Sequence, residues 1–112
     1  MNISVQNLPS GTALIALIGK MDMKGAMDID IEFNSIVQAH RLIIIDMSGV
    51  EFLASMGLRT LIMGAKSIHS RSGKMVLLAP NSLVAEVLHA SGTDVLIPVV
   101  RDQAEAERIL AS

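Results

Sequence analysis

The sequence predicts an α/β fold, in which a mainly parallel central sheet begins with an antiparallel hairpin strand and is covered by about four helices. Two observations support this. Strand-like and helix-like patterns alternate along most of the chain, and such alternation favours parallel pairing of the strands. Hydrophobic residues make up 51% of the 112 residues and charged residues 18%, which is enough apolar material for a real core. We find no internal repeat or linker, so we expect residues 1–112 to form one domain.

The amino-terminal part predicts a hairpin followed by a helix. Residues 2–8 alternate loosely between apolar and polar, Pro9-Ser10-Gly11 supplies turn residues, and residues 12–18 form a β-prone run. Gly19-Lys20-Met21-Asp22 should end this second strand. From about residue 25 to residue 39 the apolar residues recur at helical spacing and predict one buried helix face, made of Ala26, Ile29, Phe33, Ile36 and Val37.

The middle of the chain predicts the central strand and a second helix. Residues 41–47 are nearly all aliphatic, as expected of a strand that is covered on both faces. A short loop should then lead to Ser55, which we expect to be the N-cap of a helix over residues 56–70. Ser72-Gly73 ends that helix. Its expected core face consists of Leu58, Leu61, Ile62, Ala65 and Ile68.

The carboxy-terminal part predicts a strand, a third helix, a last short strand and a closing helix. The third helix should turn Leu83, Val84, Val87 and Leu88 inward. In chain order the predicted boundaries are 75–78 for the strand, Pro80-Asn81-Ser82 to Gly92 for the helix, 95–100 for the short strand and 103–110 for the closing helix, which Asp102 caps.

Charge and composition argue against several functional classes. The 9 basic and 11 acidic residues give a net charge of −2, and no basic cluster interleaves with aromatic residues, which argues against a nucleic-acid ligand. The longest apolar runs, residues 13–18 and 42–45, fall far short of the roughly 20 residues of a membrane span. Without a secretory signal or any cysteine, a cytoplasmic location is expected.

The polar residues do not assemble into an enzyme site by their spacing. Asp22 and Asp46 are better interpreted as strand-end and capping residues than as an acid and base pair. Asp28, Asp30 and Glu32 alternate around a helix without the glycine turn of a calcium loop. The histidines, His40, His69 and His89, lack metal-site spacing. We therefore expect no catalytic residue, no metal and no cofactor.

Three short segments resemble the STAS domain, the module of sulfate transporters and anti-sigma factor antagonists. Gly19-Lys20-Met21-Asp22 is similar to the family sequence after the second strand, and residues 44–52 are similar to its central strand and following turn. Ala54-Ser55-Met56-Gly57-Leu58 resembles the family's aspartate, serine, serine, glycine, leucine box, in which the first serine takes the phosphate. Here Ala54 replaces the aspartate and Met56 replaces the second serine. The predicted order of elements is also that of STAS domains.

The resemblance implies an anti-sigma factor antagonist that acts by partner switching in the control of transcription or secretion. It would bind an anti-sigma factor serine kinase of the GHKL type while Ser55 is free, and release it once Ser55 is phosphorylated. A PPM-type serine phosphatase would reset the protein, which we expect to be a monomer or weak dimer. The alternative is an unphosphorylated STAS scaffold or accessory subunit of a stress-signalling or transport complex.

The expected phosphorylation site is Ser55, and Arg59, one helical turn further on, can pair with its phosphate. Ser55→Asp should keep the fold and weaken partner binding, whereas Ser55→Ala should cost about 1 kcal/mol as a lost cap. Met21, Met23 and Met27 are expected in a loop near this helix. The partner-binding surface is predicted to comprise Asp22, Phe52, Leu53, Ala54, Met56, Gly57, Arg59, Thr60 and Met63.

Overall fold

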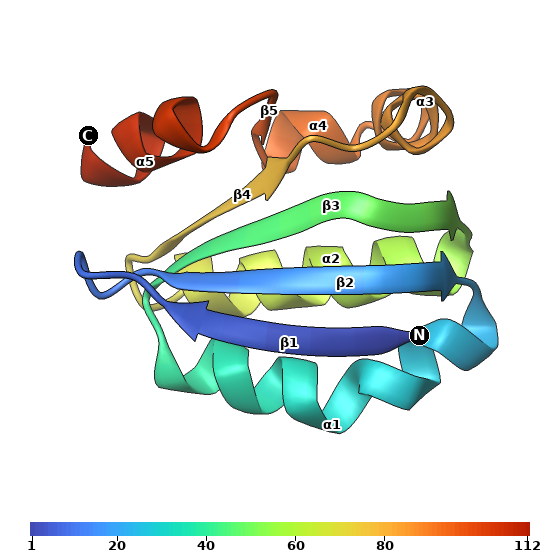
Figure 1. Ribbon diagram of the computed structural model, residues 1–112, viewed down its shortest axis with the longest axis horizontal. Helices are drawn as coiled ribbons and strands as arrows, with labels where there is room; N and C mark the ends of the chain where they lie inside the picture. The colour runs from blue at the N-terminus through green and yellow to red at the C-terminus, as the bar shows by residue number, and fades with distance from the viewer.

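A computed structural model describes residues 1–112 as one five-stranded sheet with five helices (Figure 1). In chain order the elements are β1 (Asn2–Asn7), β2 (Ala13–Met21), α1 (Met23–Ala39), β3 (Leu42–Leu53), α2 (Ser55–His69), β4 (Lys74–Leu78), α3 (Ser82–Ala90), α4 (Thr93–Leu96), β5 (Val99–Val100) and α5 (Gln103–Ala111). None of the five helices combines the length and hydrophobicity that a membrane crossing requires.

The sheet has the predicted topology. Its spatial order is β1-β2-β3-β4-β5; β1 is antiparallel to β2, and every later pair is parallel. Parallel neighbours need a crossover, and α1 and α2 supply the first two. The carboxyl ends of β2 and β3 consequently meet at one edge of the sheet, where α1 and α2 begin (Figure 1).

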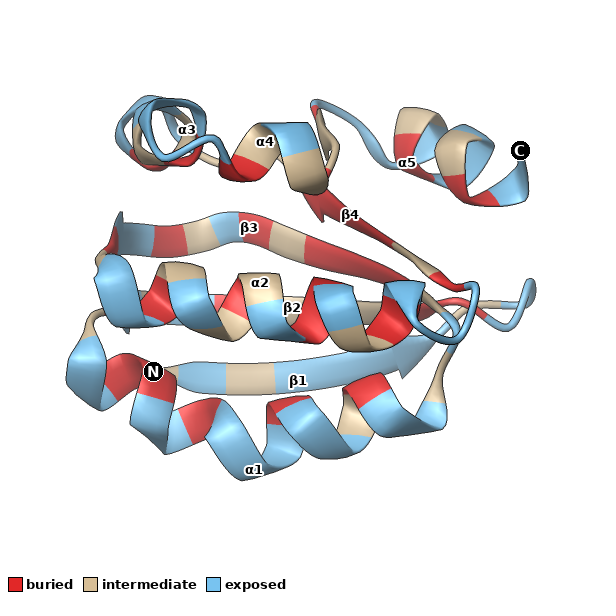
Figure 2. Cartoon of the chain, turned by 180° about the vertical axis from the view of Figure 1, so that it is seen from behind, coloured by how far each residue is buried: buried red, intermediate tan, exposed pale blue.

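Helices cover both faces of the central strand, as residues 41–47 predicted. Ile43 and Ile45 belong to a large cluster of buried side chains that includes residues of α1, α2 and α3. Ile44, between them, points to the opposite face and joins a smaller cluster with residues of α5. Figure 2 shows the consequence, since the buried stripes of α1 and α2 face the sheet while their outer sides are exposed.

The central strand is longer than predicted and leaves almost no loop before α2. Residues 48–53, expected as part of that loop, continue β3, because β2 also continues to Met21 and pairs with them as far as Met21 with Leu53. The register shifts between Ala16 and Ile18, where β3 holds one extra residue. There the Asp46 carboxylate accepts a hydrogen bond of 3.0 Å from the Ser48 amide. Asp46 therefore lies within the strand and not at its end.

The predicted strand over residues 95–100 is confirmed only at Val99 and Val100, and the prediction was wrong over residues 95–98. The short helix α4 precedes a two-residue β5, because Gly92 adopts a left-handed φ of 76° and the Ile97 amide donates to the Thr93 carbonyl at 2.9 Å. Leu83, expected inward on α3, is exposed. Val84 and Leu88, four residues apart, occupy the core face of this short helix, and Leu83 lies beside that face.

Candidate functional site

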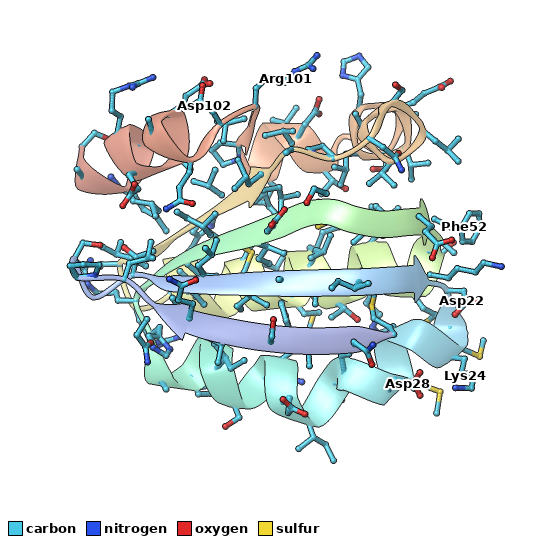
Figure 3. The ribbon with its side chains drawn as sticks, viewed as in Figure 1. Asp22, Lys24, Asp28, Phe52, Arg101 and Asp102 are labelled. Carbon is cyan, nitrogen blue, oxygen red and sulfur yellow. The ribbon has the colours of Figure 1, made fainter.

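The candidate site lies at the junction of β3 and α2, beside the end of β2. Ala54 connects the two elements, and its amide donates a hydrogen bond of 3.0 Å to the Met21 carbonyl at the end of β2. Phe52, the penultimate residue of β3, and Asp22, which directly follows β2, lie at the same end of the sheet (Figure 3). Ser55 is thereby held at the edge where α1 and α2 begin.

Ser55 is the first residue of α2 and not its N-cap, which corrects the prediction. Ala54 has the extended backbone of an N-cap, with φ of −110° and ψ of 178°, and its methyl group cannot accept a hydrogen bond from the helix start. The Ser55 side chain is exposed, and its hydroxyl makes no hydrogen bond within the chain. The hydroxyl that was expected to satisfy a backbone amide therefore faces solvent.

Gly57 lets the first turn of α2 lie directly on the end of β2. A Cβ at this position would approach Leu53 Cδ1, Met21 Cγ and the Met21 carbonyl oxygen to 2.7 Å each. Met21 and Leu53 are themselves buried. Leu53 and Gly57 were expected to contact a partner, and Met21 to lie in a loop near this helix, but burial makes all three internal packing residues that position Ser55.

Asp22 holds the start of α1 beside the start of α2. It is the N-cap of α1, and its Oδ1 accepts a hydrogen bond of 2.8 Å from the Gly25 amide. A Cβ on Gly25 would overlap the Lys20 carbonyl oxygen, so α1 also begins in close contact with the end of β2. Asp22 remains partly exposed, and its cap bond gives it a structural role whatever else it contacts.

The accessible part of the predicted surface consists of residues on either side of Ser55. Phe52, Met56 and Met63 are exposed apolar side chains, and the position of the two methionines off the core face of α2 is confirmed. Thr60 Oγ1 donates to the Met56 carbonyl at 3.0 Å, which leaves the methyl group of Thr60 to contribute to the surface. Arg59 is exposed and forms no ion pair with any carboxylate.

The surface continues onto α1, which the sequence reasoning recognised only in part. Met23 and Met27, expected in a loop, lie on the exposed side of α1, and Ile31 was not singled out at all. Two cavities of about 220 and 320 Å³ lie between α1 and α2, and residues of both helices line each of them. A signal was present in the sequence, because Met27 and Ile31 are four residues apart and off the predicted core face.

The remaining polar residues form surface contacts. No group of three His, Asp or Glu side chains is arranged to hold a metal ion. His89 Nδ1 lies 2.8 Å from Asp94 Oδ2, and the His40 ring bonds the Ile36 carbonyl. Hydrogen bonds from the Met1 amino group, which has the larger effect, and from the Lys24 side chain lower the pKa of Asp28. The His89–Asp94 pair joins α3 to α4 and the Met1–Asp28 bond joins the chain start to α1, whereas the other two contacts lie within α1 or at its end.

Comparison with known proteins gives one family. The model of the STAS domain family matches residues 4–106. The chain is 26% identical over 97 residues to BtrV of Bordetella bronchiseptica, which is named as an anti-sigma factor antagonist; the match spans 86% of this chain and 84% of BtrV. An anti-sigma factor antagonist from Mycobacterium paratuberculosis has a similar structure, with a TM-score of 0.89 and 22% identity over 99% of this chain and 94% of that one.

The anti-sigma factor antagonist SpoIIAA is also similar in structure. In its unphosphorylated form it gives a TM-score of 0.80 and 18% identity, over 99% of this chain and 98% of SpoIIAA. The Bacillus protein in its phosphorylated form gives a TM-score of 0.73 and 18% identity, over 96% of this chain and 99% of that one. At these identities the structural likeness shows a shared fold, and the family match covers most of the chain. The predicted resemblance is confirmed: this chain belongs to the STAS domain family.

Proposed function

We propose that this protein is a non-catalytic anti-sigma factor antagonist, which binds an anti-sigma factor serine kinase while Ser55 is free and dissociates once Ser55 is phosphorylated. The observation that carries the proposal is the Ser55 hydroxyl, which is exposed and makes no hydrogen bond within the chain. By the resemblance of residues 54–58 to the family box, Ser55 corresponds to its phosphate-accepting serine. The relative BtrV is named as an anti-sigma factor antagonist, and SpoIIAA occurs in phosphorylated and unphosphorylated forms.

A phosphate on Ser55 is compatible with the fold. At the first position of α2 it adds a charge of about −1.5 to −2 beside free backbone amides and the positive end of the helix dipole. Arg59, four residues on and without an ion-pair partner, is available to the phosphate. The phosphate would therefore weaken partner binding rather than the fold. A partner docked on Phe52 and Met56 would have to remove the hydration shell of the phosphate dianion, which is unfavourable.

Two departures from the family box favour a second candidate function. Ala54 and Met56 replace the usual aspartate and second serine, so the acidic residue directly before the phosphorylated serine is missing. An unphosphorylated STAS scaffold or accessory subunit does not need that residue. Such a protein would hold its partner in a stable complex without phosphate turnover, whereas the first proposal also requires a PPM-type phosphatase to restore the free serine.

The decisive experiment incubates the purified chain with GHKL-type anti-sigma factor kinases from the same genome and ATP, and measures the intact mass. We expect the gain of one phosphate in the wild-type chain and in Ser48→Ala, an exposed-serine control on β3, and no gain in Ser55→Ala. Calorimetry should then show weaker kinase binding for Ser55→Asp. A stable complex with unmodified mass would favour the scaffold function, and phosphate on another residue would contradict the proposed role of Ser55.

A further inference from the structure

Two neighbouring helices present matching stripes of side chains to one groove. On α1 the stripe consists of Met27, Asp30, Ile31 and Asn34, and on α2 it consists of Met56, Arg59, Thr60 and Met63. Each stripe follows the spacing i, i+3, i+4, i+7, which places its members on one side of a helix over about two turns. The two cavities between α1 and α2 share Asp30, Met56 and Thr60, so they form one continuous groove.

The groove concentrates apolar surface that the core does not use. Ile31 is 86% exposed, Met27 68% and Met63 56%. The opposite stripe of α1 already supplies the core with Ile29 and Phe33, so α1 cannot rotate to bury Ile31 without exposing them. Single exposed apolar residues are common on proteins, but several gathered in one groove indicate a contact surface, and methionine is frequent in surfaces that adapt to a partner.

The two walls of the groove carry opposite charges that are not satisfied by each other. Asp30 on α1 accepts only the Asn34 side-chain amide, at 3.1 Å, and forms no ion pair. Arg59 on α2 has no carboxylate partner either. A ligand with a cationic group on one side and an anionic group on the other would therefore match both walls.

We propose that this groove binds an amphipathic helix of the anti-sigma factor kinase, with an apolar stripe seated on Met27, Ile31 and Met56, a basic side chain at Asp30 and an acidic one at Arg59. Two parallel stripes, each two turns long, form the kind of surface on which a third helix packs, with its ridges of side chains between those of α1 and α2. A second copy of this chain that docked by the same groove would present another hollow surface and leave both cavities unfilled. The identity of the partner rests on the proposed function, whereas the groove does not.

Phosphorylation would act on this groove through Arg59. Ser55 and Arg59 lie four residues apart on the outside of α2, so a phosphate on Ser55 competes for the guanidinium that the docked helix would use. The same modification would thus add negative charge beside the groove and withdraw the positive charge of its α2 wall. Partner release would then need no change in the fold.

The test compares Ile31→Asp with Val95→Asp in calorimetric binding to the same kinases. Both positions carry a highly exposed aliphatic side chain, but Val95 lies on α4 and does not line the groove. We expect Ile31→Asp to weaken binding by about tenfold or more and Val95→Asp to change it less than about twofold. The chain has no cysteine, so a fluorophore on Ile31→Cys, but not on Val95→Cys, should report transfer to an apolar environment when the kinase binds.

The outcomes separate this inference from the proposed function. If Ile31→Asp binds as tightly as wild type while Ser55→Asp binds more weakly, the groove inference is wrong and the function stands. If Ile31→Asp weakens binding while Ser55 is never phosphorylated, the groove stands and the switch is wrong. A wild-type dimer that Ile31→Asp dissociates, measured by light scattering, would assign the groove to a second copy and overturn the inference. Failure to bind any of these kinases would overturn both.

Discussion

Replacing Gly57 by alanine should destabilise the protein, although alanine is the better helix former. The added Cβ would lie 2.7 Å from two side-chain carbons, which can move, and 2.7 Å from the Met21 carbonyl oxygen, which cannot move freely because it accepts the Ala54 amide at 3.0 Å. Overpacking of this kind costs about 1–3 kcal/mol. The gain in helix propensity is at most about 1 kcal/mol. We therefore expect a net loss of about 1–2 kcal/mol in the free energy of unfolding.

Urea unfolding followed by circular dichroism measures this loss. With a slope of about 1–3 kcal/mol per M for a small protein, the midpoint of Gly57→Ala should fall by roughly 0.3–2 M. Met63→Ala, on the exposed side of the same helix, serves as the control and should stay within about 0.5 kcal/mol of wild type. If Gly57→Ala is as stable as wild type, α2 can move off the end of β2, and the glycine is not what positions Ser55.

Two further predictions concern the helix starts and the acid limb of stability. Ser55→Ala should change the free energy of unfolding by less than about 0.5 kcal/mol, because the Ser55 hydroxyl makes no hydrogen bond within the chain. Asp22→Ala should lower it by about 1 kcal/mol, because the hydrogen bond that caps α1 is lost. Thermal unfolding of both variants compares these two effects directly. The Asp28 carboxyl should titrate below its ordinary value of 3.8 in an NMR pH series. Because the pKa of Asp28 is lowered in the folded state, the Asp28 carboxylate stabilises the fold above its unfolded pKa, and this stabilisation is lost as the pH falls through the folded pKa. Asp28→Asn should remove this contribution to the loss of stability in acid.

Apart from α4, the element order and most helix boundaries could be predicted because they depend on local patterns. The core face of α1 follows from the spacing of Ile29, Phe33 and Val37, and Asp102 caps α5 as predicted, with its Oδ1 accepting the Glu105 amide at 2.8 Å. The end of β3 was missed because Ser48-Gly49 is typical of a turn. Pairing with β2, which itself continues to Met21, overrides that local preference.

The candidate site was predicted less well because its geometry depends on contacts between distant segments. Alanine is a poor N-cap and serine a good one, so local chemistry favours a helix that begins after Ser55. The bond from the Ala54 amide to the Met21 carbonyl instead starts α2 one residue earlier. The same contact between distant segments buries Leu53 and Gly57. The sequence motif does not show this burial, so both residues were predicted to lie on the surface with their neighbours in the chain.

The packing of the α2 start determines where a charge on Ser55 can act. Gly57 already brings the first turn into contact with Met21 and Leu53, so the turn has no room to move toward the sheet. The Ser55 side chain points to solvent, where a phosphate keeps its hydration and meets the positive end of the helix. The phosphate is therefore expected to cost the folded state little free energy, too little to unfold or shift α2. The contacts that it can change are those between α2 and a docked partner. A regulatory charge at this position is consequently expected to change which surfaces dock while the sheet and its helices stay in place.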